Sequence, residues 1–64
     1  MDKLKQLELK IANEAPYVGA KPYSHNIIGM VLQQVEEEFG IEKVKLFVKI
    51  YDLDKKGWGF ILNK

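Results

Sequence analysis

Apolar residues recur at helical spacing between Tyr23 and Gly40, and this is the strongest pattern in the chain. At the helical period of 3.6 residues per turn they fall on one continuous arc. The arc consists of Ile27, Ile28, Val31, Leu32, Val35 and Phe39. Ser24 stands where an N-cap is expected, with Asn26 as the alternative, and Gly40 stands where a left-handed residue ends a helix. The pattern predicts a helix over residues 25–39 that turns its apolar arc inward.

An earlier segment, residues 2–14, also has helical periodicity. Its narrow apolar stripe consists of Leu4, Leu7 and Ile11. Asp2 precedes the stripe and is expected to cap the helix. Residues 15–23 follow with two prolines and Gly19, which disfavour helix and predict an ordered connector between the two helices.

The segment after Gly40 fits both a helix and a strand. As a helix over residues 42–52 it has a polar stripe that consists of Glu42, Lys45, Lys49 and Asp52. As a strand it alternates apolar and polar residues and continues through a turn into a second strand, although Gly59 weakens that strand. The helix accounts better for the polar stripe. It predicts that Gly57 ends a short final turn and that Trp58 and Phe60 fold back over the helices.

The elements together predict an all-α fold, a compact three-helix domain with an aromatic C-terminal tail. The alternative is an α+β fold, with two helices and a C-terminal β-hairpin at about residues 44–62. We expect residues 1–64 to form a single small domain. At this length folding buries only about 60% of the surface of the unfolded chain, so helix packing, self-association or a partner must supply stability.

Reactive side chains are scarce. The chain has no cysteine and no arginine, and its one histidine is His25. Ser24, His25 and Asn26 are adjacent in sequence, whereas the members of a catalytic triad converge from separated positions. We therefore expect His25 to cap a helix or make a hydrogen bond. Because no ligand cluster or catalytic motif is recognisable, we expect no enzyme activity, no metal and no cofactor.

Charge is distributed unevenly although the formal net charge is +1. Residues 26–42 carry four glutamates and no lysine, and residues 43–64 carry six lysines and two aspartates. These two segments can attract one another within one molecule or between copies, but solvated charged faces are the preferred interpretation. The longest apolar run, residues 27–32, is far shorter than the roughly 20 residues of a membrane span, and the amino terminus lacks the apolar core of a secretory signal. We therefore expect a cytoplasmic protein without a membrane partner.

Gly29 is unusual because a glycine inside a helix costs about 1 kcal/mol relative to alanine. It lies on the polar side of the central helix, next to the long apolar Met30. Either the backbone of a partner approaches there, or another layer of the same fold does. We predict a non-catalytic protein–protein interaction module, such as a small regulator or inhibitor. Its partner is expected to be another protein or a second copy of the same chain. The predicted partner-binding residues are Asn26, Gly29, Met30 and Gln33, or the tail residues Trp58 and Phe60.

A helix-turn-helix nucleic-acid-binding protein is the alternative function. The two helices around Gly40 would form the motif, and the phosphate contacts would come from Lys43, Lys45 and Lys49. The near-neutral charge, the acidic first helix of the pair and the lack of arginine disfavour this hypothesis.

Overall fold

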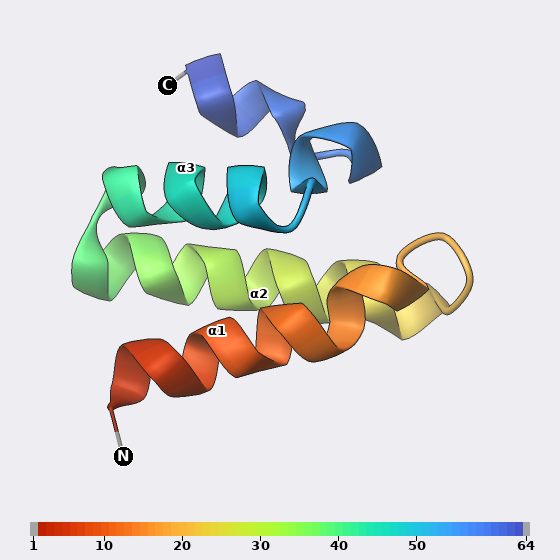
Figure 1. Cartoon of the computed structure of the whole chain (residues 1–64), viewed down its shortest axis with the longest axis horizontal. Helices are drawn as coiled ribbons and strands as arrows, with labels where there is room; N and C mark the ends of the chain where they lie inside the picture. The colour runs from red at the N-terminus through yellow and green to blue at the C-terminus, as the bar shows by residue number, and fades with distance from the viewer. Residues whose placement is uncertain (1, 64) are drawn as a thin grey trace.

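Residues 2–63, which the computed structural model describes, form three α-helices (Figure 1). The helices are α1 Lys3–Glu14, α2 Pro22–Phe39 and α3 Ile41–Ile50. Short 3₁₀ turns follow at η1 Ala15–Tyr17, η2 Leu53–Lys56 and η3 Gly59–Asn63. Within residues 2–63 the only β pairing is an isolated bridge between Val18 and Lys21. The all-α three-helix prediction is therefore confirmed, and the alternative hairpin at about residues 44–62 is wrong.

Helix α1 begins where the sequence predicts it. The carboxylate of Asp2 accepts a hydrogen bond from the backbone N–H of Leu4 at 3.1 Å, which satisfies one of the free donors of the first turn. Leu7 and Ile11 are buried in the core, and Leu4 packs partly buried against it. The predicted cap and the predicted apolar stripe are both confirmed.

The start of α2 differs from the prediction. The helix begins at Pro22, so Ser24 and Asn26 lie inside it, and Lys21 occupies the N-cap position without a side-chain cap. Proline suits the first helical turn because its φ is already helical and its missing N–H is not needed there. Ser24 is fully buried, and its hydroxyl donates a hydrogen bond to Oε1 of Glu14 at 2.8 Å. Ser24 thus joins two helices and does not cap one.

Most of the apolar arc of α2 faces inward. Its buried members are Ile28, Val31, Leu32 and Val35. Ile27 packs partly buried at the edge of this core. Phe39 is 39% exposed, so the prediction that it lies in the core is wrong. It is the last residue of α2, where the chain reverses into α3.

Gly40 is the single residue between α2 and α3. Its φ of 92° is strained for a residue with a side chain, and its N–H donates a hydrogen bond to the carbonyl of Glu36 at 3.0 Å. The predicted end of the helix at this glycine is confirmed. Helices α2 and α3 then run side by side in opposite directions (Figure 1).

Beyond α3 the chain turns back over the core. Helix α3 ends at Ile50, earlier than predicted, and Asp52 adopts a left-handed conformation with φ 55°. Gly57, with φ 119°, ends the turn η2 as predicted. The residues that close the core are Leu53, Trp58 and Ile61. Trp58 folds back into the core as predicted. Phe60 also folds back beside α2, but it is 58% exposed and does not close the core.

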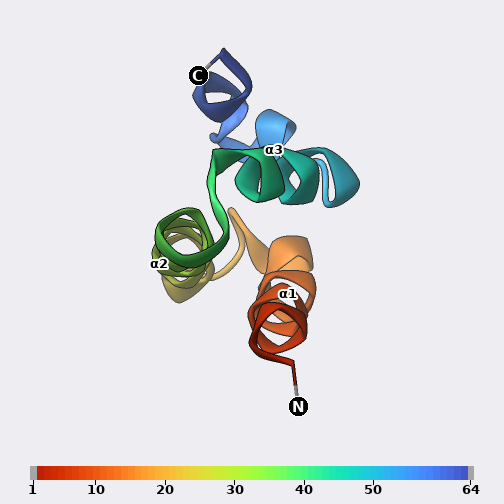
Figure 2. The ribbon, with the colours of Figure 1, turned by 90° about the vertical axis from the view of Figure 1, so that its left-hand side faces the viewer.

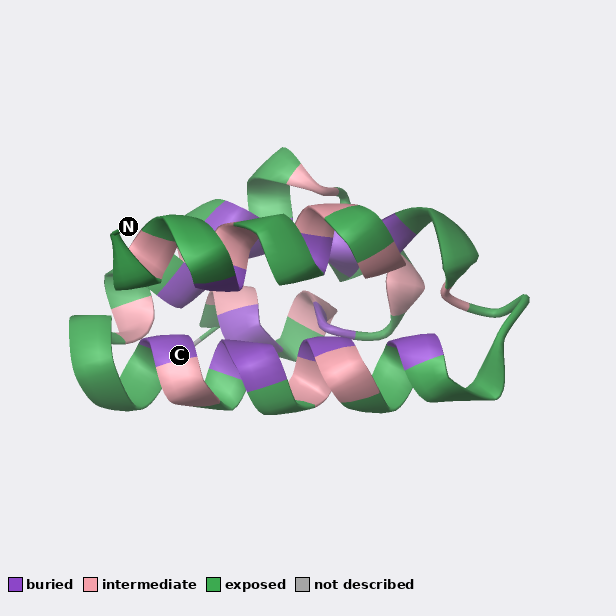
Figure 3. Ribbon diagram, turned by 90° about the horizontal axis from the view of Figure 1, so that it is seen from below, coloured by how far each residue is buried: buried purple, intermediate pink, exposed green. Residues whose placement is uncertain are grey.

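Viewed from the end, the three helices surround one core, with α2 in contact with both α1 and α3 (Figure 2). The Tyr51 hydroxyl donates a hydrogen bond to Oε2 of Glu8 at 2.8 Å, and Lys3 pairs with Glu38 at 2.7 Å. The outer side of α2 carries exposed residues along its length (Figure 3). None of the helices within residues 2–63 has both the length and the apolar character to cross a bilayer.

Candidate functional site

Four of the predicted partner-binding residues share the outer side of α2. Asn26, Gly29, Met30 and Gln33 follow the spacing i, i+3, i+4, i+7, which places them on one patch of helix surface. We call this patch the α2 face. Asn26 and Gln33 are exposed, Met30 is 71% exposed and Gly29 is half-buried. The α2 face is uncharged and combines one long apolar side chain with two amides.

Gly29 leaves a gap in this surface. A Cβ atom added at this position would meet nothing within 4 Å. Its φ is not in the positive region that favours glycine, so the backbone does not require a glycine there. Because this position is open, no other segment within residues 2–63 packs closely against Gly29. Neither backbone conformation nor internal packing accounts for Gly29.

The C-terminal segment places Trp58 and Phe60 beside the α2 face. A groove of about 270 Å³ lies between α2 and this C-terminal segment, and we call it the aromatic groove. The predicted residues that line it are Gly29, Gln33, Trp58 and Phe60; the others are Leu32, Glu36, Val44 and Ile61. The structure thus brings together two surfaces that the sequence treated as alternatives. Asn26 and Met30 are not among the residues that line this groove.

The two aromatic side chains of the groove differ in exposure. Trp58 is buried, and its ring stacks on that of His25 with 4.4 Å between ring centroids and 23° between ring planes. His25 lies inside α2, so the predicted capping role is wrong, and its ring covers the indole. Phe60 is largely exposed at the side of the groove. Aromatic side chains, Phe among them, are enriched in protein interfaces relative to the rest of the surface.

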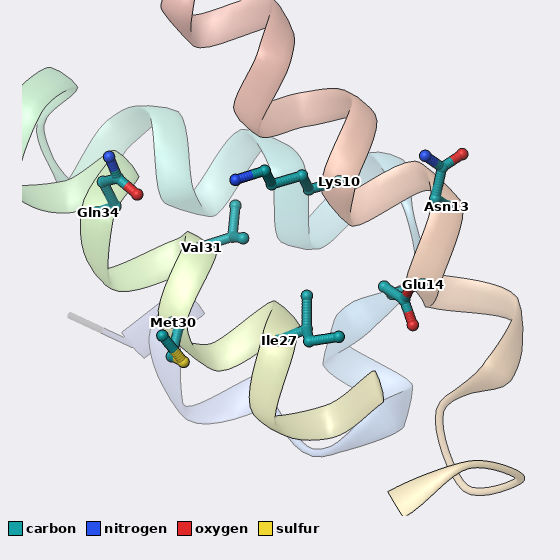
Figure 4. Close-up of a pocket in the computed structure, with 7 residues that line it drawn as sticks. All are labelled: Lys10, Asn13, Glu14, Ile27, Met30, Val31 and Gln34. Carbon is teal, nitrogen blue, oxygen red and sulfur yellow. The ribbon is translucent and has the colours of Figure 1, made fainter. Parts of the chain in front are cut away.

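A second groove, between α1 and α2, was not predicted from the sequence (Figure 4). It has a volume of about 400 Å³, and we call it the helical groove. Its residues are Lys10, Asn13 and Glu14 from α1 and Ile27, Met30, Val31 and Gln34 from α2. In Figure 4 the side chain of Lys10 extends from α1 toward Val31 and Gln34. The spacing of Ile27, Met30 and Gln34 on one side of α2 was the available signal, but the position of α1 was needed to recognise a groove.

The α2 face lies between the two grooves. Gly29 and Gln33 line the aromatic groove, and Met30 lines the helical groove. Toward its carboxyl end the face is bordered by exposed Glu37 and by Glu38. Hydrogen bonds from Lys3 and Gln34 hold the pKa of Glu38 below its ordinary value. This side of α2 therefore offers apolar contacts at its centre and negative charge at one end.

No cluster of three histidine, cysteine or carboxylate side chains suited to a metal ion occurs in residues 2–63. The side chains that line the two grooves are apolar groups, amides, carboxylates and one lysine. Such groups make apolar contacts and hydrogen bonds.

The lysines of the alternative hypothesis do not share one side of α3. Lys43 and Lys45 are two residues apart and therefore lie on nearly opposite sides of the helix. Lys45 is half-buried and pairs with Glu42 at 3.6 Å. In a helix-turn-helix the two helices cross at about 90–120° after a turn of 3–4 residues, whereas α2 and α3 are antiparallel neighbours around Gly40. Nucleic-acid binding stays a prediction that this arrangement does not support.

Comparison with known proteins assigns no relatives. No protein-family model, curated protein or solved structure matches this chain.

Proposed function

We propose that this protein is a non-catalytic protein-binding module that recognises a partner through the α2 face and the aromatic groove. One observation carries the proposal. Gly29 lies inside a helix, has open space above it, and stands next to the protruding side chain of Met30. The glycine destabilises the helix by about 1 kcal/mol relative to alanine, and a close approach by a partner accounts for it.

Each part of the surface has a distinct role in binding. Met30 has a flexible, polarizable side chain that adapts to an apolar pocket of a partner. Gly29 permits a partner backbone to approach α2 closely, and Phe60 adds rigid apolar contact area. Asn26 and Gln33 supply hydrogen-bond donors and acceptors around these contacts. Covering part of a partner in this way would suit a small regulator or an inhibitor.

One isolated exposed apolar residue on α1 serves as a comparison for this surface. Leu9 on α1 is 45% exposed, but it lines neither of the two grooves. Single exposed leucines are common on soluble proteins and have no necessary function. Leu9 therefore provides a matched control position for experiments on Met30.

The proposal is tested by photo-crosslinking in cells of the native host. A photoreactive phenylalanine analogue replaces Met30 in one variant and Leu9 in another. We expect a discrete protein adduct from position 30 only, which mass spectrometry identifies. The identified protein is then purified, and its affinity for the wild type and for Gly29→Leu is measured by calorimetry.

The Gly29→Leu variant is expected to fold and to bind about tenfold more weakly or worse, on the scale of a hot-spot residue. Circular dichroism and urea unfolding verify that the variant remains folded. Equal adducts from positions 9 and 30, or unchanged affinity of a folded Gly29→Leu variant, would refute the proposed surface.

A further inference from the structure

We infer that the partner of the α2 face is a second copy of this chain, bound with the two α2 helices antiparallel. This inference rests on the proposed function and names the partner of the same surface.

The α2 face is complementary to itself. A two-fold axis through its centre, perpendicular to α2, sets Gly29 of one copy beside Met30 of the other, and Asn26 beside Gln33. Met30 is 71% exposed, and open space lies above Gly29, so a protruding side chain meets a gap. Each amide has an acceptor and at least one remaining donor for the opposite amide, since Gln33 Nε2 donates one hydrogen bond to Glu37 Oε1 at 3.4 Å within its own helix. A symmetric dimer requires such matching of one surface with itself.

Charge selects the antiparallel orientation. The amino end of α2 has the positive end of the helix macrodipole and, at the N-cap position, exposed Lys21, whose ammonium lies 4.3 Å from the centroid of the Tyr17 ring. The carboxyl end carries exposed Glu36 and Glu37. Glu37 accepts a hydrogen bond from the neutral amide of Gln33, whereas Glu38 pairs with Lys3. In an antiparallel pair each acidic end lies beside the basic end of the other copy, and symmetry provides this attraction twice. A parallel pair would place like ends together.

Phe60 enlarges the contact beyond one helix. It is 58% exposed and lines the aromatic groove beside Gly29, so it borders the surface on which the second helix would lie. A contact formed by one helix and a neighbouring aromatic residue belongs to the small, weak class of interfaces. We therefore expect a dimer that dissociates on dilution. Dimerisation would also supply stability that a chain of this size otherwise lacks.

Cysteine cross-linking tests the predicted pairing because the natural chain has no cysteine. The double variant Asn26→Cys/Gln33→Cys is expected to form a disulfide-linked dimer on mild oxidation. The two positions lie about 10 Å apart along one helix, too far for a disulfide within a single chain. The matched control is Gln6→Cys/Asn13→Cys, at two exposed positions with the same spacing on α1. Equal dimer yields from both variants would overturn the inference.

Sedimentation equilibrium of the untreated protein measures the dimer directly. We expect the average mass to rise toward twice the chain mass as concentration increases to about 0.5 mM, where a micromolar dissociation constant leaves most chains paired. Lys21→Glu and Glu37→Lys are each expected to weaken the dimer, and the combined variant to restore it. Urea unfolding verifies that each variant is folded. A protein that stays monomeric over this range, or a combined variant weaker than both single ones, refutes the inference.

Failure of this inference and failure of the proposed function have different outcomes. If the wild type is monomeric while Met30 forms a Gly29-dependent cross-link to a different protein, the second-copy inference is wrong and the proposed function stands. If the wild type is monomeric and position 30 captures no protein, both are wrong.

Discussion

The Ser24 hydroxyl donates a hydrogen bond to Oε1 of Glu14 at 2.8 Å, and this bond joins the first turns of α2 to the last turn of α1. Ser24 has no exposed surface, whereas Glu14 is half-buried and also lines the helical groove. The bond therefore holds two helices whose sequences are separated by the proline-containing connector.

Removing either partner of this bond should destabilise the fold, and the loss should be larger for Glu14 than for Ser24. Glu14→Ala leaves a buried hydroxyl without its acceptor and is expected to cost about 1–3 kcal/mol. Ser24→Ala removes the buried donor, and the half-buried carboxylate can turn to water, so the cost should be nearer 1 kcal/mol. Urea unfolding of both variants measures the difference. Wild-type stability in both would show that the bond contributes nothing.

Gly29→Ala should stabilise the isolated protein by up to about 1 kcal/mol. The added methyl group meets nothing within 4 Å, and the backbone does not need a glycine at this position. Gly40→Ala is the matched control, because its φ of 92° makes a side chain strained and should destabilise the fold. Thermal unfolding at a concentration low enough to keep the protein monomeric measures both effects. Destabilisation by Gly29→Ala would contradict the open space above the helix.

Trp58 and Phe60 should differ strongly in their contribution to stability. Trp58→Ala removes a buried ring and is expected to cost about 3–5 kcal/mol, a large part of the stability of a chain of this size. Phe60→Ala removes a side chain that is 58% exposed and should cost under about 1 kcal/mol. Chemical unfolding compares the two variants. Similar losses would place Phe60 in the core and not at the edge of a binding surface.

Tyr51 should make stability depend on pH in the alkaline range. Burial, and then the hydrogen bond and negative charge of Glu8, raise the pKa of Tyr51 above its ordinary value of 10.0. Because the folded state favours the neutral phenol, this stabilisation is complete below about pH 10 and is lost as pH rises through the folded pKa. The difference in phenolate absorbance between wild type and Tyr51→Phe gives the titration of this group. A midpoint at or below 10 would contradict the predicted direction.

The parts of the fold that depend on neighbouring residues were predictable from the sequence. Asp2 caps α1 because the cap bond spans only two residues, and Gly40 ends α2 because a positive φ favours glycine wherever it occurs. The inward side of α2 followed from helical periodicity, which is also local. Ser24 was misassigned because Pro22 begins the helix earlier and a distant acceptor, Glu14, occupies its hydroxyl.

Local patterns in the sequence predicted the first two helices, favoured a third helix over a hairpin, and placed Asn26, Gly29, Met30 and Gln33 on one outward side of α2, since helix period and capping act over a few residues. Only the tertiary structure decided that Trp58 is buried while Phe60 borders Gly29, and that a groove lies between α1 and α2. These features arise where surfaces from distant parts of the chain meet. Their positions depend on how helices pack, which no local pattern of residues specifies.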